Sequence, residues 1–449
     1  MSEAEARGPR KGLANVARNL GWMLASRGVT ALLSLVYLAI VTRTLGVTNF
    51  GRFAIITGAS QVLAVLVGFQ TWQIIVRYGT AHLAAGDNDR LARLFHASAA
   101  LDAASAVVGA ALSAVILFMW GDMLGIGPTL WRATLAFTIV QLLSLRSTPL
   151  GILRLHDRFS LAAIAESTTP IVRLVGAGLI ALLHPTLQGF LVAWMAAELL
   201  TAAAYWLMVA RTGRFRPFGS VGRGLKAVFA DNPGIIRFAI TTNANSTLSL
   251  SGKQIPLLLV GAFAGTTAAG EFRLGAQLAQ SMTKLSQMLT RAAFPEIVRS
   301  IDAGGLRRVG RMLARSVGVA SIIAALVFGL VLLIGRPVLG LVGGPAYVGA
   351  YPILLWLSAA GCVDLITVGF EPVLMAAGRT GRAFLIRLAA TTALVAVTLM
   401  LAPELGAVGI ASAVLVYSVV MALLLALLLA RTVNGDTSRR APEPQPEPR

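Results

Sequence analysis

The chain has 449 residues, of which 56% are hydrophobic and only 13% are charged, and its mean hydropathy is +0.77. A soluble domain carries about 25% charged residues, so this composition excludes a water-soluble protein. The net charge of +19 would usually suggest nucleic acid as a partner, but the placement of the basic residues favours a membrane instead.

Apolar runs of about 20 residues recur along the whole chain, separated by short polar breaks. Because a hydrocarbon core ~30 Å thick needs about 20 helical residues, each run is predicted to be a spanning helix. No stretch alternates polar and apolar residues with the period of two that a β-barrel strand needs. The sequence therefore predicts an all-α polytopic membrane protein with about twelve transmembrane helices.

In chain order, the predicted elements form two lobes of six helices each. Residues 1–18 are polar and basic, and we expect an uncleaved cytoplasmic tail there. The N-lobe, 19–210, holds spans at 19–41, 51–72, 94–119, 131–152, 159–183 and 187–210. A cytoplasmic linker at 211–234 leads to the C-lobe, 235–430, with spans at 235–262, 268–293, 312–334, 348–376, 382–401 and 404–430. Residues 431–449 are expected to be a disordered cytoplasmic tail, because their end is polar and rich in proline.

The distribution of Lys and Arg predicts the orientation. With both termini in the cytoplasm, 29 of the 38 basic residues fall in the tails, in the cytoplasmic connections or at the span ends beside them; four fall on the outer side and five lie deeper within spans. This asymmetry is the one that the positive-inside rule requires. The basic connections then face anionic membrane lipid, and no nucleic-acid partner is needed.

A short motif occurs once in each predicted lobe. Leu38, Val41, Gly46, Thr48, Gly51, Phe53 and Gln61 recur 219 residues later as Leu257, Val260, Gly265, Thr267, Gly270, Phe272 and Gln280. Each copy is an apolar run that ends in a Gly-x4-Gly-x-Phe turn and is followed by another apolar run. The repeat indicates two related membrane hairpins and a two-lobed, transporter-like body.

Several sequence patterns that could indicate a catalytic or metal site have simpler explanations or are incomplete. The run Asp87-Asn88-Asp89 has the spelling of a glycosyltransferase metal site, but a turn that caps the next helix explains it more simply. The four histidines have no ligand spacing, and the single Cys362 excludes an intramolecular disulfide or a Cys-based metal site. No phosphate-binding Gly-x4-Gly-Lys-Ser/Thr motif occurs. The sequence predicts no metal, no cofactor and no catalytic residue.

One predicted helix carries a ladder of polar residues. Within 268–293, six of them step by 4, 3, 4, 3 and 4 residues and therefore share one face: Arg273, Gln277, Gln280, Lys284, Gln287 and Arg291. The cations suit a phosphate or pyrophosphate, and the amides suit sugar hydroxyls. The alternative is a helix inside the bundle whose polar groups bond to neighbours. Three cations on one stripe are hard to satisfy in that way, which favours a substrate-binding face.

Other spans carry further charges. Basic candidates for the same cavity are Arg27, Arg77, Arg173 and Lys253. Acidic residues in or beside spans are Asp102, Glu166, Glu198, Glu271, Glu296, Asp364 and Glu371. A charge near the bilayer centre costs at least ~2.5 kcal/mol, so such groups usually face a partner or a wet cavity. For the pairs Glu166 with Arg173 and Asp364 with Glu371, each seven residues apart, a cavity role and structural hydrogen bonding both remain open.

The chain resembles the Wzx-type polysaccharide flippases of the multidrug/oligosaccharidyl-lipid/polysaccharide exporter superfamily. The resemblance rests on TRTLGVTNFGRF after the first span, GFQTWQIIVRYG near the end of the second, LHDRF, RAAFPEIVRS and AAGRTGR. It covers essentially the whole chain, and the order of the motifs is more specific than any one of them.

The resemblance implies two six-helix lobes around a central cationic cavity in the bacterial inner membrane. It also implies movement of undecaprenyl-pyrophosphate-linked oligosaccharide from the inner to the outer leaflet by alternating access. On this hypothesis Arg27, Lys253, Arg273 and Lys284 receive the head group. Glu166, Asp364 and Glu371 then exchange protons or sodium, as in an antiporter. Polysaccharide polymerase and export proteins are candidate partners.

Two other functions stay open at this point. A cation-coupled drug or small-solute exporter shares the superfamily, but those exporters often carry an acidic residue on the first helix, and none occurs in 19–41. A membrane glycosyltransferase or polymerase of the same pathway would usually carry a large extracytoplasmic loop, whereas the predicted outer connections are short.

Overall fold

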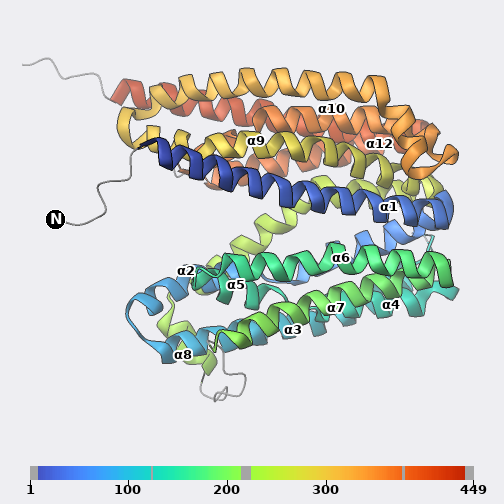
Figure 1. The fold of residues 1–449 in the computed structure, drawn as a ribbon, viewed down its shortest axis with the longest axis horizontal. Helices are drawn as coiled ribbons and strands as arrows, with labels where there is room; N and C mark the ends of the chain where they lie inside the picture. Colours follow the sequence, from blue (N-terminus) through green and yellow to red (C-terminus); the bar gives the residue numbers. More distant parts are fainter. Residues whose placement is uncertain (1–8, 123–124, 214–223, 377–379, 440–449) are drawn as a thin grey trace, which may run out of the picture.

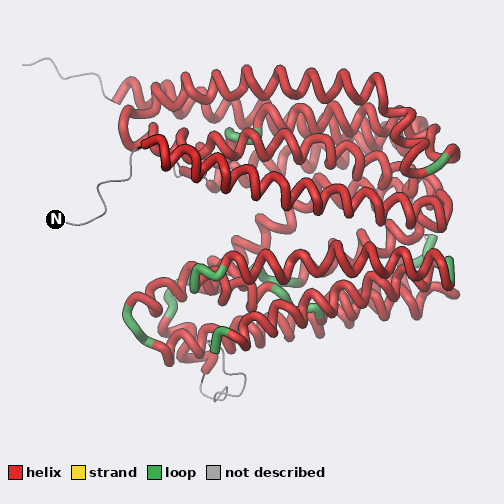
Figure 2. Tube along the Cα trace, in the orientation of Figure 1, coloured by secondary structure: helices red, strands yellow, loops and turns green. Residues whose placement is uncertain are grey.

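The computed structural model describes the backbone of residues 9–122, 125–213, 224–376 and 380–439. Side chains are described for the same residues except 9–32, 224–226, 251, 253, 282–315, 372, 375–376, 380 and 433–439. The described chain is helical throughout and contains no strand; short loops join the helices (Figure 2). The all-α class predicted from the sequence is therefore confirmed.

Helices α1 to α12 run in the following order, with one 3₁₀ turn at Pro345–Ala350. They are α1 (Pro9–Val67), α2 (Thr71–Ala84), α3 (Asn88–Trp120), α4 (Pro128–Leu143), α5 (Ser147–Leu155), α6 (Phe159–Leu183), α7 (Leu187–Arg211), α8 (Gly224–Asp231), α9 (Ile235–Gly343), α10 (Tyr351–Thr367), α11 (Phe370–Ala376) and α12 (Thr380–Arg439). Figure 1 shows α2–α8 together in one half of the molecule and α9, α10 and α12 in the other, with α1 against α9.

Three of these helical runs reverse direction at a glycine. Gly46, Gly265 and Gly406 have φ of 68°, 81° and 55°, a region that glycine enters without the steric cost of a Cβ. Arg273 Nη1 donates to Gln254 Oε1 at 3.5 Å, although 19 residues separate them. In a straight helix that separation would be about 28 Å, so α9 folds back on itself at Gly265.

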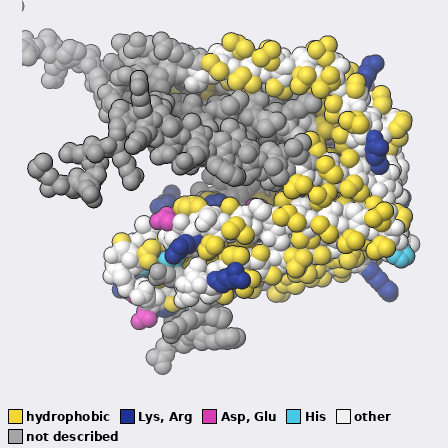
Figure 3. Space-filling model, viewed as in Figure 1, with side chains coloured by type: hydrophobic (Ala, Val, Ile, Leu, Met, Phe, Trp, Pro, Cys, Tyr) yellow, Lys and Arg dark blue, Asp and Glu magenta, His cyan; other side chains and the backbone are white. Residues whose placement is uncertain are grey.

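Nine segments of the described chain are long and apolar enough to span a membrane. Three of the nine contain the reversals at Gly46, Gly265 and Gly406: Leu33–Ala84, Gln254–Ser281 and Gly381–Thr432. Counting each reversal, the chain makes the twelve crossings that the sequence predicts. Figure 3 shows that the described surface visible from this side is mostly hydrophobic, as lipid contact requires.

Three of the spans predicted from the sequence are interrupted in the structure. The runs 51–72, 131–152 and 348–376 were expected to be continuous, but helices end and restart at 68–70, 144–146 and 368–369. Pro149 explains the second break, because its missing N–H and its ring would disrupt a continuous helix. The carbonyl of Leu145, four residues earlier, instead accepts a hydrogen bond from Trp206 Nε1 at 2.9 Å.

The two copies of the sequence repeat meet at one end of the molecule, which we call the glycine end, the end that holds Gly46, Gly265 and Gly406. The hydroxyls of Thr48 and Thr267 lie 2.9 Å apart. A Cβ placed on Gly51 would lie 1.7 Å from the carbonyl oxygen of Thr266, and one on Gly270 would lie 2.3 Å from that of Val47. Both glycines are therefore needed for this approach. The repeat predicted two hairpins but not their contact.

The apolar core divides along the membrane axis. Toward the glycine end, one cluster joins both halves and includes Phe50, Phe190, Phe272 and Tyr347. Toward the opposite end the halves have separate clusters, one around Phe95 and Tyr205 and another around Phe370 and Leu425. Figure 1 shows the ribbons of the two halves close together at the glycine end and diverging toward the other. At that other end, among the described residues, only the start of α9 reaches the first half, where Ile235 and Ala239 pack with Ile74 and Leu94, while the clusters around Phe95 and Phe370 stay separate.

The Asp87-Asn88-Asp89 run forms the turn that the sequence predicts. Asp87 is the N-cap of α3, and its Oδ1 accepts a hydrogen bond from the backbone N–H of Arg90 at 3.0 Å. That hydrogen bond holds the pKa of the Asp87 carboxyl below its usual value. Within the described residues, no group of His, Cys, Asp and Glu could hold a metal ion.

Candidate functional site

A cavity of about 260 Å³ lies between the two halves. Its walls come from α1, α4, α6 and α7 on one side and from α9 on the other. Counted from the ends of their helices at the glycine end, Arg173, Glu198 and Arg273 lie about 12–17 Å deep at 1.5 Å per residue. That depth is the middle of a hydrocarbon core ~30 Å thick. We call this space the central cavity.

Two arginines and one carboxylate form the strongest polar cluster in the central cavity. Glu198 on α7 accepts from Arg146 Nη2 at 2.5 Å and from Arg173 Nη2 at 2.7 Å. Glu198 is 2% exposed, whereas the side chains of Arg146 and Arg173 are 27% and 24% exposed. The carboxylate is therefore buried behind the two guanidinium groups, and these reach the cavity. One negative charge faces two positive charges in this cluster, which we call the Glu198 triad.

Each arginine of the triad is positioned by its local structure. Arg146 lies in the break between α4 and α5, so the interruption that Pro149 enforces also turns this side chain into the cavity. Arg173 lies on α6, and its guanidinium carbon is 5.2 Å from the ring centre of Trp194, a cation–π contact. Its Nε is buried and has no hydrogen-bond partner among the described atoms.

The α9 wall adds a third cation and one amide, and a second amide of α9, Gln254, lies behind them. Arg273 and Gln277 line the central cavity, and Arg273 also reaches Gln254. Gln254 Nε2 donates to Gln61 Oε1 at 2.7 Å, so the amides of both halves are linked. Among the described carboxylates, none forms an ion pair with Arg273. The lining thus carries three arginines against Glu198 and Glu166, a net charge of +1.

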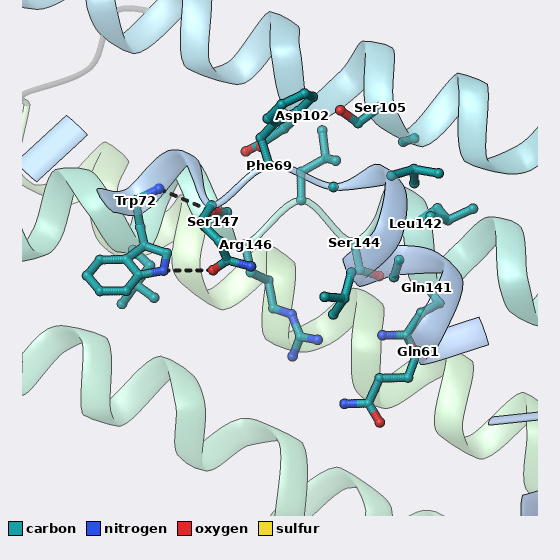
Figure 4. A pocket seen from close by; sticks show the side chains of 18 of the residues that line it. Gln61, Phe69, Trp72, Asp102, Ser105, Gln141, Leu142, Ser144, Arg146 and Ser147 are labelled. Carbon is teal, nitrogen blue, oxygen red and sulfur yellow. Dashed lines mark hydrogen bonds between the residues drawn. The ribbon is translucent and has the colours of Figure 1, made fainter. Parts of the chain in front are cut away.

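A second cavity, of about 380 Å³, continues from the first toward the end opposite the glycine end. Gln61, Gln141, Arg146 and Glu166 line both. Figure 4 shows Arg146, Gln141 and Gln61 around one side of this second cavity and Trp72 beside Ser147. Glu166 accepts a hydrogen bond from Tyr205 OH at 2.7 Å. Aliphatic and aromatic side chains share this lining with serine hydroxyls and three glutamine amides, for which we call it the amide cavity.

Asp102 on α3 connects the two helix breaks that lie beside the amide cavity. Its carboxylate accepts from Thr71 Oγ1 at 2.9 Å, from Thr148 Oγ1 at 2.7 Å and from the backbone N–H of Thr148 at 3.1 Å. Thr71 begins α2 and Thr148 lies in the first turn of α5. Asp102 is only 7% exposed and therefore ties α3 to both restarted helices from inside the protein.

Comparison with known proteins identifies the family. A model of the family described as polysaccharide biosynthesis protein matches residues 16–301. The chain belongs to this family. The matched region contains every residue of the Glu198 triad together with Arg273 and Gln277. Inner membrane protein YghQ of Escherichia coli (strain K12) is 28% identical over 349 residues, which cover 76% of this chain and 95% of that protein.

The chain has a fold that is known from solved structures of transporters. The inward closed conformation of the lipid II flippase MurJ matches with a TM-score of 0.72 at 10% identity, covering 90% of this chain and 87% of that one. An inward-facing multidrug resistance MATE family transporter of the MOP superfamily matches with a TM-score of 0.64 at 15% identity, covering 91% and 96%. The predicted twelve-helix, two-lobed architecture is confirmed.

The structure brings some of the predicted site residues together. Arg173, Arg273, Gln277 and Glu166 all line the central cavity. Gln280 is half-buried on α9 and outside the lining of both cavities. The side chains of the other ladder members and of two further predicted cations lie outside the described residues: Arg27, Lys253, Lys284, Gln287 and Arg291.

Three predicted residues lie away from both cavities. Arg77 is exposed on α2, where its guanidinium carbon is 4.4 Å from the ring centre of Phe238. Glu371 pairs with Arg387 Nη2 at 2.7 Å. Asp364 is exposed on α10. The described structure therefore gives Glu371 a structural partner, and its proposed role in ion coupling stays a prediction.

Sequence reasoning missed the most important contacts of the site. Glu198 and Asp102 were noted only as acidic residues within spans, and Arg146 was not singled out. The available signal was Pro149 inside an apolar run, because a proline there predicts a break near Arg146. No spacing in the sequence could have paired Glu198 with arginines 25 and 52 residues away.

Proposed function

We propose that the protein is an inner-membrane flippase that moves undecaprenyl-pyrophosphate-linked oligosaccharide from the cytoplasmic to the outer leaflet. The observation that carries this proposal is the net positive cavity at mid-membrane depth, with Arg146, Arg173 and Arg273 in its walls. Arginine binds phosphate oxygens through two parallel N–H donors, so a pyrophosphate is a fitting ligand. Membership of the polysaccharide biosynthesis protein family and the fold shared with MurJ support it.

The two connected cavities suit the two parts of such a head group. In the proposed bound state the pyrophosphate lies in the central cavity and the sugars extend into the amide cavity. Sugar hydroxyls both donate and accept hydrogen bonds, and the side-chain amides of Gln61 and Gln141 can do the same. The apolar lipid tail remains in the bilayer, since burying it in a polar cavity would cost about 0.8 kcal/mol per CH₂ group.

Alternating access is the proposed transport cycle. With both termini in the cytoplasm, as the positive-inside rule predicts, the glycine end is the outer end. The contact between the two repeats then seals the outer side, and the separated apolar clusters lie on the cytoplasmic side. Transport requires the repeat contact to open. Glu166, which lines both cavities, and the predicted Asp364 and Glu371 are candidates for coupling this change to a proton or sodium gradient.

Replacing Arg273 by alanine tests the proposal in cells. In a strain whose surface polysaccharide depends on this protein, Arg273→Ala should reduce the polysaccharide at least tenfold, because the α9 wall loses its described cation. Arg336→Ala is the matched control, since Arg336 stacks on Tyr351 at 4.8 Å and does not line either cavity. Membrane levels of both variants should equal the wild type. Normal polysaccharide in the Arg273→Ala strain would contradict the cavity assignment.

A further inference from the structure

Glu198 occupies the place that an anionic ligand would take in the central cavity. Its two carboxylate oxygens bridge arginines from two separate elements, at 2.5 Å and 2.7 Å. Such short N–O distances are those of charge-assisted hydrogen bonds. A phosphate group would present two oxygens to the same two guanidinium groups. The carboxylate on α7 thus has the geometry of a bound anion that belongs to the protein itself.

The two arginines keep donors available while they hold Glu198. Each guanidinium has five N–H donors, and the bonds to Glu198 use one Nη of each arginine. Arg173 Nε is buried without a hydrogen-bond partner among the described atoms, which is unfavourable for an N–H donor. The Nη groups that do not bond to Glu198 remain available to a second anion on the cavity side. The Glu198 triad therefore carries a net charge of +1, and one of its N–H donors, Arg173 Nε, has no hydrogen bond among the described atoms.

We propose that Glu198 is a resident counter-anion that gives up Arg146 and Arg173 to a phosphate group of the substrate. This inference rests on the proposed function and adds to it one residue, Glu198, that sets the affinity of the central cavity for the phosphate group of the substrate. Two unpaired arginines at mid-membrane would be unstable, so the empty transporter needs an anion there. A phosphate presents the same kind of oxygen acceptors as a carboxylate, so it can take the place of Glu198 without leaving either guanidinium group unpaired. The same carboxylate takes the arginines back when the substrate leaves.

Binding of inorganic pyrophosphate to the purified full-length protein tests this exchange. Glu198→Gln removes the competing charge and keeps the side-chain shape, so isothermal titration calorimetry should find pyrophosphate bound at least tenfold more tightly than by the wild type. Glu198→Asp, one methylene shorter, cannot hold both arginines at the same distances and should change the affinity in the same direction. If Glu198→Gln does not fold, the pyrophosphate affinity of Glu198→Asp provides the same test.

A matched control lies at the protein surface. Asp231 also bridges two arginines, Arg90 at 3.4 Å and Arg93 at 2.9 Å, but outside both cavities. Asp231→Asn therefore changes the net charge equally and removes a carboxylate from two arginines, of which Arg90 keeps its ion pair with Asp87. It should change pyrophosphate affinity less than twofold. Equal gains in Asp231→Asn and Glu198→Gln would mean general electrostatics and would overturn the inference.

Two further outcomes distinguish a failure of the counter-anion role from a failure of the proposed flippase function. If the wild type binds pyrophosphate, Arg273→Ala weakens that binding and neither Glu198 variant strengthens it, the counter-anion role is wrong and the flippase proposal stands. If neither the wild type nor the Glu198 variants bind pyrophosphate, the cavity is not an anion site. In that case the proposed function fails as well.

Discussion

A disulfide between Thr48→Cys and Thr267→Cys is expected to abolish transport, and a reductant is expected to restore it. The two hydroxyls lie 2.9 Å apart across the contact between the repeats, so oxidation should join the halves at the glycine end. A transporter that must open there would then be held in one conformation. The expected loss is essentially complete, because one covalent bond outweighs the few kcal/mol that separate typical conformational states.

The chain offers a clean background for this measurement. Its single cysteine, Cys362, is buried and can be replaced by alanine. Ser60→Cys with Thr138→Cys is the control pair, because these hydroxyls lie 2.7 Å apart but within one half. Formation of each disulfide is checked by mass spectrometry, and flipping is measured in vesicles before and after reduction. Full transport by a cross-linked pair at 48 and 267 would rule out opening at the glycine end.

Replacing Asp102 by alanine is expected to give the largest loss of stability. The change removes the acceptor for two threonine hydroxyls and for the backbone N–H of Thr148, all in a buried site. Leaving buried donors without a partner costs about 3 kcal/mol or more. We expect Asp102→Ala to unfold several degrees below the wild type in detergent, as followed by fluorescence-detected size-exclusion chromatography.

The control for Asp102 lies on the same helix. Asp89 is an exposed carboxylate in the first turn of α3, and its contribution there is at most about 1 kcal/mol. Asp89→Ala should therefore leave the unfolding temperature almost unchanged. Equal unfolding temperatures for Asp102→Ala and the wild type would mean that the two helix breaks do not depend on this carboxylate.

The sequence is sufficient to predict the large features of this fold, because they follow from the bilayer. Spans appear as apolar runs, and a glycine recurring at the same position in two runs predicts related turns at Gly46 and Gly265. Breaks within spans are harder to predict, since the runs around Gly68 and Ser144 stay apolar on average. Pro149 indicates the second break, but no proline lies near the first. Tertiary contacts of Asp102 and Trp206 then satisfy the backbone and side-chain groups that the breaks free.

The site was predictable only where a single helix face carries it. Arg273 and Gln277 share one face by spacing, and they line one cavity. The Glu198 triad joins α6, α7 and the α4–α5 break, and no periodicity relates residues on three elements. A buried carboxylate in a span indicates that a partner exists, but the sequence does not say which one.

The central claim is that the arginines of the central cavity carry the anionic head of a lipid-linked oligosaccharide across the membrane. Purified protein in liposomes, given a fluorescent undecaprenyl-pyrophosphate oligosaccharide, tests it most directly. Quenching from outside measures how much lipid has crossed. The account predicts rapid crossing of the pyrophosphate lipid, and at least tenfold slower crossing both for a neutral glycolipid with the same sugars and in Arg173→Ala. Equal rates for the charged and the neutral lipid would contradict it.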